Sequence, residues 1–445
     1  AASTITNTQR IDDLWEGKLL FPTAKVVAGY DFVGRRYNPP HLCSAAQEAA
    51  GTCTSTPIPD PDPLDGGGHG THVSGIVAGN AFAGGLSNGA APGAKLVGLK
   101  IYGEDGGDEA ADVLVDAIEW CGNANLGLET RGTVPPRVDA VNISLGEDWA
   151  VASTLFDTTA AAATAAGVTI VASAGNSGNR AFIVGTPSAS PPIVSVASTV
   201  PPESGMEIVT TNGITSTTHV GLESVIARPF KDVIAGGRME GQLAWFGRGC
   251  GEDPQPQDVS ERVALVERGL CNLSDKILKA QGKGAIAVLM FTNENPKSQM
   301  AGDAAGITIP AAMIDRAPGE ALRDMLLGGA EMHVTFDASK VTLDLSSADL
   351  VAGYSSRGPN VHGALKPDIA APGSNIMSAA MGTGSRGASF NGTSMAGPHV
   401  AGAAGVVAQR NRTENLKLDG LGVAALLMNY AQPTVYAGGG IVPIP

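Results

Sequence analysis

The sequence predicts a three-layer α/β domain with a mostly parallel sheet, interrupted by a smaller β-rich domain. Three observations lead to this prediction. Short β-branched runs alternate with helical patterns, as they do in parallel α/β sheets. Glycine-rich turns follow the ends of these runs, where such sheets place their ligands. The sequence then changes character between Gly205 and Lys340, and 445 residues are more than one core usually organises.

The predicted parallel strands lie in the first half of the chain. Each is short, apolar and rich in β-branched residues, which is typical of strands buried on both faces. They are Lys95–Ile101, Val138–Leu145, Val168–Ala172 and Ile193–Ala197. Helical patterns separate them over Glu109–Cys121 and Val151–Ala166.

The middle of the chain predicts a second kind of domain. Two strand-like sequences, Arg262–Cys271 and Ala285–Phe291, flank one helical pattern around Ser274–Gly282. The glycine-rich α/β style returns at Val351–Asn360. We therefore predict one α/β domain in two parts, residues 1–203 and 346–445, with an inserted domain over residues 204–345.

The composition is that of a folded, acidic protein. Hydrophobic residues make up 43% of the chain and charged residues 16%, which excludes disorder of the whole chain. The net charge of −14 argues against nucleic acid and anionic membranes as main partners. No apolar stretch reaches the roughly 18 residues of a membrane span. No signal peptide begins at Ala1, so we expect either a cytosolic protein or a chain that starts after its targeting segment.

Five cysteines bear on the compartment. Cys43 and Cys53 are close enough in sequence to close one short loop, and Cys250 and Cys271 to close another. Cys121, at the end of a helical pattern, is expected to be a buried thiol. Two disulfides favour an oxidising compartment, and we expect a secreted, extracellular protein.

His69 and His72, three positions apart, directly follow the glycine run Gly66–Gly68. We expect a helix to begin near His69. A zinc pair on a helix usually stands four apart with a glutamate between, whereas His69 and His72 stand three apart with no acid between. This spacing argues against a metal site.

Ser394 and Asn176 are two further candidates for chemistry. Ser394 stands at the start of an apolar helical pattern, where the positive end of the helix favours negative charge on an oxygen. Taken alone, such a serine is also a common helix cap. Asn176 follows an apolar strand between small residues, so its amide can donate to an oxyanion or simply close a turn.

In combination, these stretches resemble the subtilisin-like serine proteases, the subtilases. HGTHVSG is similar to the family's histidine motif, ASAGN to its oxyanion asparagine motif and NGTSMAGPHVAG to its serine motif. AVNISLG is similar to the substrate-binding strand, and KPDIAAPG to the segment that leads to the serine. The resemblance covers about Pro22–Val200 and Val351–Val442.

The resemblance implies a serine endopeptidase that hydrolyses protein or peptide substrates without a cofactor or metal in its chemistry. His69 would be the general base for Ser394, and Asn176 with the backbone N–H of Ser394 would hold the oxyanion. His72 and His399 would be structural. A substrate-binding strand and the pocket for the side chain before the cut would be lined by Ser144, Leu145, Gly146, Ser173, Ala174 and Gly175. These pocket residues point to neutral or apolar side chains there.

Two further segments carry separate expectations. The inserted region, with VALVERGLCNLSDKILKAQGKGAIAVLMFTN and then IPAAMI, resembles the protease-associated (PA) domain. That resemblance implies a role in substrate access or protein contact and no chemistry of its own. The acidic loop Asp60–Asp65 offers oxygen ligands for a structural Ca²⁺, but we prefer the simpler interpretation of a solvated proline-rich turn.

The carboxylate that orients the base in a Ser/His/Asp triad has no clear match. Asp31 resembles the family segment that follows the aspartate strand, and the Asp60–Asp65 loop is no core strand. We therefore expect the aspartate strand to precede Ala1, so that this chain lacks it. The alternative is a divergent triad that uses Asp12 or Asp13.

Two other functions compete with the protease. A catalytically inactive subtilase-like protein would bind peptides through Ser144–Gly146 and the PA domain. An α/β-hydrolase esterase would need a G-x-S-x-G motif and a histidine well after the serine. Here the serine stretch is Gly-Thr-Ser-Met-Ala, and His399 is the only later histidine, which argues against the esterase.

Overall fold

The computed structural model describes residues 21–39, 42–81, 87–103, 113–129, 131, 135–149, 153–224, 226–234, 236–251, 253–293, 297, 300, 306–344, 348–384 and 387–433. The chain divides into two compact units. The first unit comprises Ala1–Thr199 and Tyr354–Pro445, and the second comprises Val200–Gly353.

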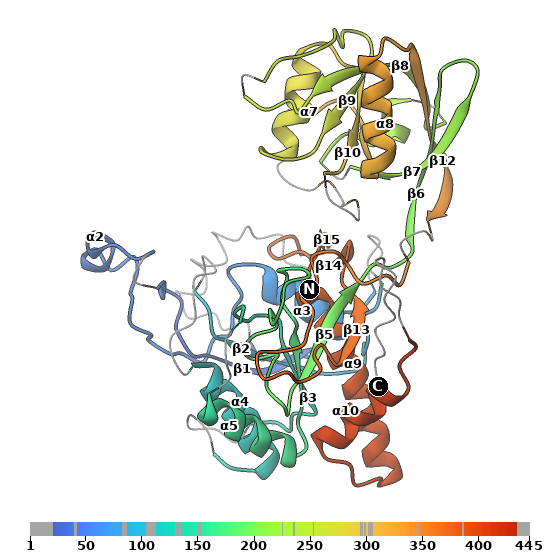
Figure 1. Cartoon of the computed structure of the whole chain (residues 1–445). Coiled ribbons are helices and arrows are strands. Elements are labelled where there is room, and N and C mark those ends of the chain that lie inside the picture. Colours follow the sequence, from blue (N-terminus) through green and yellow to red (C-terminus); the bar gives the residue numbers. More distant parts are fainter. Residues whose placement is uncertain are drawn as a thin grey trace. The chain divides into compact units, whose positions relative to one another are not determined.

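The first unit is built on parallel strands (Figure 1). A four-stranded sheet has the order β13-β5-β4-β3 and is parallel throughout. Its strands are β3 (Ala140–Ile143), β4 (Thr169–Ser173), β5 (Val194–Thr199) and β13 (Ile369–Pro372). A second parallel pair joins β1 (Val26–Asp31) to β2 (Leu96–Lys100). The predicted α/β class and mostly parallel sheet are confirmed.

Helices cover both faces of the four-stranded sheet. On one face, Ile170 and Ala172 of β4 share a core with α4 (Val113–Leu126) and α5 (Thr154–Ala165). On the other face, Val171 packs with residues of α9 (Thr393–Glu414) and α10 (Gly420–Asn429). Because successive side chains of a strand point to opposite faces, this alternation makes three layers.

One predicted helix end was wrong. The pattern ended at Cys121, but α4 continues to Leu126. Glycine and asparagine residues after Cys121 interrupt the apolar helical pattern, so the pattern did not predict the last turn of α4. Asn125 stabilises that turn. Its amide donates to the carbonyl oxygens of Val138 (2.8 Å) and Ala166 (3.1 Å), and its side-chain oxygen accepts from the Val138 N–H (2.8 Å).

The parallel strands of the first unit do not form one continuous sheet. Among the described residues, β2 pairs only with β1, and β3 pairs only with β4. Both strands nevertheless contribute to one hydrophobic core, through Val97 and Leu99 of β2 and Ile143 of β3. Residues of β2 are half-buried throughout, whereas those of β4 and β5 are all buried. One edge of β2 and one edge of β3 therefore keep peptide groups without a ladder partner in the described part of the chain.

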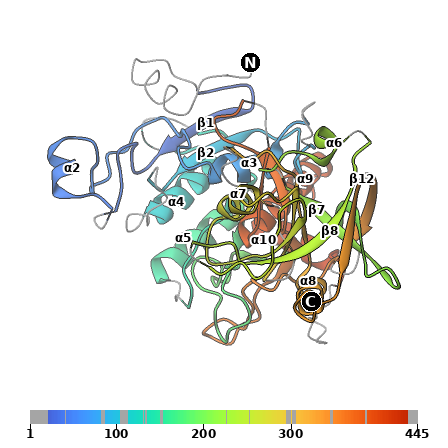
Figure 2. The same cartoon turned by 90° about the horizontal axis from the view of Figure 1, so that it is seen from above.

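Two smaller elements of this unit matter for the site. Helix α3 (His69–Ala78) lies beside α9 (Figure 2). Val73 and Ile76 of α3 pack on Met395 of α9. A hairpin of β14 (Ile376–Ala379) and β15 (Gly387–Phe390) lies against α3. Gly75 permits this approach, since a Cβ there would stand 2.3 Å from the Ser378 hydroxyl.

The second unit is a closed barrel with the strand order β10-β11-β7-β6-β12-β8-β9. Its strands are β6 (Glu203–Thr211), β7 (Ser216–Glu223), β8 (Arg238–Gly247), β9 (Val263–Glu267), β10 (Ala287–Phe291), β11 (Ala311–Ile314) and β12 (Met332–Asp344). Its helices are α6 (Phe230–Val233), α7 (Leu273–Gly282) and α8 (Arg316–Leu327). Alternate residues of β10 pack with α7 and with α8, so one strand serves two cores.

The cysteines pair as their spacing predicted. Cys43 bonds to Cys53, beside α2 (Ala45–Ala49), and Cys250 bonds to Cys271. Cys121 is a free, buried thiol, and burial raises its pKa to about 12. No helix in the described ranges is both long and apolar enough to cross a bilayer.

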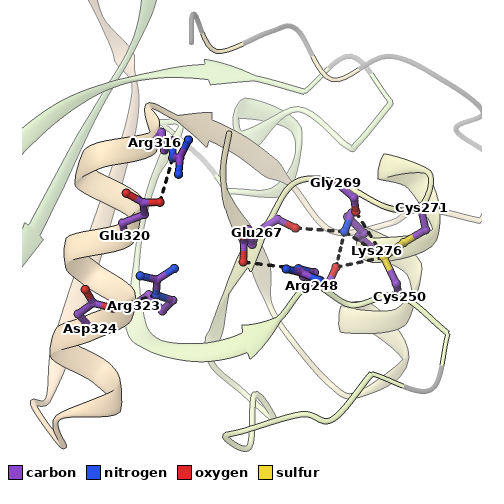
Figure 3. A network of polar contacts seen from close by, with 10 residues as sticks. All are labelled: Arg248, Cys250, Glu267, Gly269, Cys271, Lys276, Arg316, Glu320, Arg323 and Asp324. Carbon is purple, nitrogen blue, oxygen red and sulfur yellow. Dashed lines mark hydrogen bonds and ion pairs between the residues drawn. A yellow bond between two sulfur atoms is a disulfide. The ribbon is translucent and has the colours of Figure 1, made fainter. Parts of the chain in front are cut away.

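A buried lysine lies beside the second disulfide (Figure 3). The side chain of Lys276 on α7 is fully buried. Its ammonium donates to the carbonyl oxygens of Arg248 (2.5 Å) and Glu267 (3.1 Å) and lies 3.2 Å from the Cys250 sulfur. Burial is the main reason that the pKa of Lys276 falls to about 8.

Candidate active site

The sequence-predicted residues lie at the carboxyl ends of neighbouring parallel strands. Ser144–Gly146 follow β3, and Ala174–Asn176 follow β4. These two strands are directly paired, so the segments after them lie side by side. The Ser173 hydroxyl, at the end of β4, donates to the Leu145 carbonyl oxygen at 3.5 Å.

Ser394 is the second residue of α9, and it touches the segment after β3. The Ser394 hydroxyl donates to the Ser144 carbonyl oxygen at 3.2 Å. In return, the Ser144 hydroxyl donates to the Ser394 carbonyl oxygen at 2.7 Å and accepts from the Asn142 amide at 2.9 Å. The structure therefore brings together two residues that are 250 positions apart in the chain.

Asn176 is held by Thr393, the residue before Ser394. Its side-chain oxygen accepts from the backbone N–H and from the hydroxyl of Thr393, both at 2.9 Å. A backbone N–H can only donate, so the atom that faces it must be the oxygen. The amide –NH₂ of Asn176 is therefore the end that remains to donate. The Thr393 hydroxyl also accepts from the Gly175 N–H at 3.2 Å, which ties the start of α9 to the segment after β4.

Glycines let the chain reach this helix start. Gly392 donates from its backbone N–H to the Gly373 carbonyl oxygen at 2.9 Å. A Cβ on Gly373 would stand only 2.3 Å from the Ser198 hydroxyl and 2.6 Å from the Gly392 carbonyl oxygen. The segment that leads to the serine thus packs directly on the end of β5.

His69 opens α3 and keeps an exposed surface. Partial burial of the ring lowers its pKa from the ordinary value of 6.5, and the charge of Asp65 acts in the opposite direction. Helices α3 and α9 are in contact, but the structure records no hydrogen bond between the His69 ring and the Ser394 hydroxyl. These two described side chains belong to helices that are in contact, but they are not hydrogen-bonded to each other.

Asp65 supports the helix and not the histidine ring. One of its oxygens accepts from the backbone N–H groups of Gly67 (3.0 Å) and Gly68 (2.8 Å). The other accepts from the backbone N–H (2.7 Å) and the hydroxyl (2.5 Å) of Thr71. Both oxygens are used in capping α3, next to the positive end of the helix.

The other described aspartates before α3 are Asp31, Asp60 and Asp62, and none of them is hydrogen-bonded to His69. Asp31 is buried, accepts from the Val33 and Gly34 N–H groups and pairs with Lys100 at 2.8 Å. Burial raises the pKa of Asp60 and of Asp62. Asp12 and Asp13 lie outside the described residues. No described carboxylate is hydrogen-bonded to His69, and no three potential metal-ligating side chains converge within the described ranges.

His72 and His399 have structural partners. The His72 ring is buried, and its Nε2–H donates to the carbonyl oxygens of Ile376 (3.1 Å) and Ala388 (2.9 Å). It also stacks on Phe390, with ring centroids 4.2 Å apart. His399 donates from Nδ1 to the Met395 carbonyl oxygen at 2.9 Å, within its own helix. Burial lowers the pKa of both rings.

Sequence reasoning did not find Thr393 or Asp148. Thr393 fixes the orientation of Asn176, and Asp148 accepts a hydrogen bond from the Ser177 hydroxyl. A threonine directly before a serine at a helix start was a visible signal for the first. Nothing in the local pattern marked Asp148, because its partner is 29 positions away.

The family model and the curated relatives point to one family. A model described as the subtilase family matches residues 40–441. The chain is 32% identical over 431 residues to the minor extracellular protease Vpr of Bacillus subtilis, covering 93% of this chain and 46% of that protein. It is 31% identical over 371 residues to a C5a peptidase of Streptococcus pyogenes, covering 78% of this chain and 29% of that protein.

The chain therefore spans about half the length, or less, of these relatives. Among solved structures, the psychrophilic subtilisin-like protease Apa1 from an Antarctic Pseudoalteromonas matches with a TM-score of 0.43 and 20% identity. That match covers 85% of this chain and 81% of the other.

Proposed function

The chain belongs to the subtilase family, and from this premise we propose that it carries the catalytic machinery of a secreted serine endopeptidase. The observation that best supports the proposal is the clamp of Thr393 on Asn176. It leaves the Asn176 amide –NH₂ as the end that can donate, and a Cβ added to Gly392 would stand 3.6 Å from both that nitrogen and the Ser394 backbone nitrogen. Two such donors are what a tetrahedral oxyanion needs.

In the proposed reaction, the Ser394 hydroxyl attacks the carbonyl carbon of a peptide bond. His69 takes the hydroxyl proton and then gives it to the leaving amine, which leaves an acyl-enzyme. The lowered pKa of His69 keeps its ring neutral and able to accept a proton near neutral pH. Water then attacks the acyl group by the same route in reverse.

The proposal requires a small movement of the nucleophile. At rest, the Ser394 hydroxyl donates to the Ser144 carbonyl oxygen and not to His69. Rotation about one side-chain bond would release it. Catalytic hydrogen bonds are often long or absent before substrate binds.

We propose that the carboxylate orienting His69 comes from one more parallel strand between β2 and β3. Those two strands share a core but do not pair in the described part of the chain. The only described carboxylate with a charge effect on His69 is Asp65, whose oxygens cap α3. The alternative is that Asp12 or Asp13 supplies the carboxylate.

We propose protein or peptide substrates, bound through their backbone to Ser144, Leu145 and Gly146 as an added strand. The segment Ser173, Ala174 and Gly175 would flank the side chain before the cut. The chemistry would need no cofactor. The Asp60–Asp65 loop is better explained as a structural turn than as a calcium site. The Asp65 carboxylate caps α3, and the backbone of Asp60 forms an isolated antiparallel β-bridge with the backbone of Asp31.

We propose that the second unit is a protease-associated domain that governs substrate access or protein contact, with no chemistry of its own. Its closed barrel and its disulfide suit a module exported to an oxidising compartment. The two disulfides support an extracellular location, as does the similarity to the minor extracellular protease Vpr.

A second candidate function is peptide binding without catalysis. It is favoured by one observation, namely that His69 is engaged neither with Ser394 nor with a described carboxylate. Covalent chemistry at Ser394 distinguishes the two candidates.

The test is to treat the full chain with a fluorophosphonate probe and to map the modified residue by mass spectrometry, with Ser394→Ala as the blank. Labelling of Ser394 supports the protease, and the single variants Asp12→Asn and Asp13→Asn then ask whether either aspartate is needed. A folded chain that is not labelled at Ser394 supports peptide binding. In that case, restored labelling after addition of an aspartate-bearing strand would show that Ser394 can react once His69 is oriented.

A further inference from the structure

Asp148 lies beside the segment proposed to flank the substrate side chain before the cut. It follows Gly146 by two positions, in the segment after β3. One of its carboxylate oxygens, Oδ2, accepts a hydrogen bond from the Ser177 hydroxyl, which belongs to the segment after β4. Asp148 therefore bridges the two segments on which the substrate would lie.

The second oxygen of Asp148 faces the wall formed by Gly175. A Cβ added to Gly175 would stand 3.5 Å from Oδ1 of Asp148, in van der Waals contact. Gly175 itself has a φ of +102°, which strongly favours glycine, and a Cβ would also stand 2.8 Å from the Ser356 hydroxyl. The space beside the Gly175 Cα is thus filled by the buried Ser356 side chain, next to Oδ1 of the exposed Asp148.

The charge of Asp148 is not neutralised by its neighbours. The residue is exposed, and it forms no ion pair with any described lysine, arginine or histidine. Its sequence neighbour Glu147 is a second exposed carboxylate. A carboxylate held in place by Ser177 and open on one side is suited to receive a cation.

We propose that Asp148 is a specificity-determining residue that favours lysine or arginine before the scissile bond. This inference rests on the proposed function of the same site. The pocket residues predicted from the sequence pointed to neutral or apolar side chains, but Asp148 was not among them. A long basic side chain can lay its methylene groups along the Gly175 wall and bring its charge to the Asp148 carboxylate.

The test compares two peptide diphenyl phosphonates that differ only in the side chain next to phosphorus, one lysine-like and one norleucine-like. Both react with the serine hydroxyl, and mass spectrometry measures the labelling rate of Ser394 in the full chain. We expect the cationic probe to react roughly threefold to tenfold faster at low salt, as for a partly exposed ion pair. The preference should shrink at high salt, because exposed charges are screened.

Three variants separate charge recognition from a merely structural tie between the two segments. Asp148→Asn keeps the shape but removes the charge, and it should bring the ratio of the two rates close to one. Ser177→Ala removes the tie but keeps the charge, and it should retain most of the preference. Glu119→Gln, an exposed residue of α4, makes the same change of net charge away from the site and should leave the ratio unchanged.

Equal rates for the two probes in the unmodified chain would overturn this inference alone, as would a preference that survives in Asp148→Asn. Equal loss of preference in Asp148→Asn and Ser177→Ala would mean that the bridge acts only as a structural tie. If even the neutral fluorophosphonate fails to label Ser394, the proposed function fails first, and the inference falls with it.

Discussion

Ser144 and Ser394 hold each other through two reciprocal hydrogen bonds. Each hydroxyl donates to the backbone carbonyl of the other residue, at 2.7 Å from Ser144 and 3.2 Å from Ser394. One bond fixes the first turn of α9 on the end of β3, and the other holds the proposed nucleophile in a resting position. The same pair therefore links the stability of the helix start to the availability of the serine.

Replacing Ser144 by alanine should destabilise the first unit. The change removes the bond to the Ser394 carbonyl and leaves the Asn142 amide without its acceptor. We expect the unfolding free energy to fall by about 0.5–1.5 kcal/mol, measured by urea unfolding. Ser389→Ala is the matched control, because the buried Ser389 hydroxyl has no hydrogen-bond partner among the described residues and its loss should be neutral or stabilising. Equal destabilisation by both variants would contradict the role given to Ser144.

Replacing Asn176 by aspartate should remove an oxyanion donor and keep the local fold. Aspartate retains the oxygen that accepts from Thr393 but has no N–H to donate. The rate of fluorophosphonate labelling at Ser394 should fall about 10²–10³-fold, a figure that comes from the matching donor of subtilisin itself. Labelling that proceeds at the original rate would show that Asn176 only closes a turn.

The dependence of labelling on pH should report the His69 ring. The base is active when neutral, and partial burial holds its pKa below 6.5. The labelling rate should therefore rise with pH and level off at an apparent pKa under that value, measured over roughly pH 5 to 8. An apparent pKa above 6.5 would indicate that a carboxylate already stabilises the protonated ring, against the arrangement described here.

Lys276 should make the stability of the second unit depend on pH in the alkaline range. Its pKa is about 8 when folded and 10.5 ordinarily, so between these values the unfolded chain binds more protons and the unfolding free energy rises with pH. Below about pH 8 the lysine is charged in both states, and this contribution is constant. Relative to Lys276→Met, the unmodified chain should therefore gain stability as pH increases across that window.

The matched control for this experiment is Lys283→Met, which removes an exposed lysine at the end of the same helix. Thermal unfolding of the full chain at several alkaline pH values, with the disulfides intact, measures both variants. A parallel pH trend in the unmodified chain and in Lys276→Met would mean that the buried ammonium is already stabilised to its ordinary extent.

Local sequence pattern was sufficient for the elements that carry their own periodicity. β4 and β5 are fully buried, so their apolar runs were visible. The end of α4 was missed because Asn125 is stabilised there by hydrogen bonds to Val138 and Ala166, which lie in other parts of the chain. Pairing between distant segments, such as β5 with β13, leaves no trace in a local pattern.

The same contrast holds at the site. His69, Asn176 and Ser394 were found because their motifs are contiguous. Thr393 and Asp148 act through partners more than two hundred and about thirty positions away, respectively, so only the fold reveals what they touch. The sequence left two interpretations of Asn176 open, an oxyanion donor or a turn residue. The hydrogen bonds from Thr393 show which end of its amide is available to donate.

The pairing of β5 with β13 also sets an order for making the protein. β5 ends at Thr199, and β13 begins only at Ile369, after the whole second unit has been synthesised. At typical rates of synthesis, this separation corresponds to roughly 8 to 30 seconds. During that time the apolar residues of β5 are not yet covered by β13 and α9. The barrel can close earlier, once its last strand, β12, has been synthesised. The nascent first unit is thus a natural client for chaperones, and the barrel would be the earlier of the two to resist proteolysis.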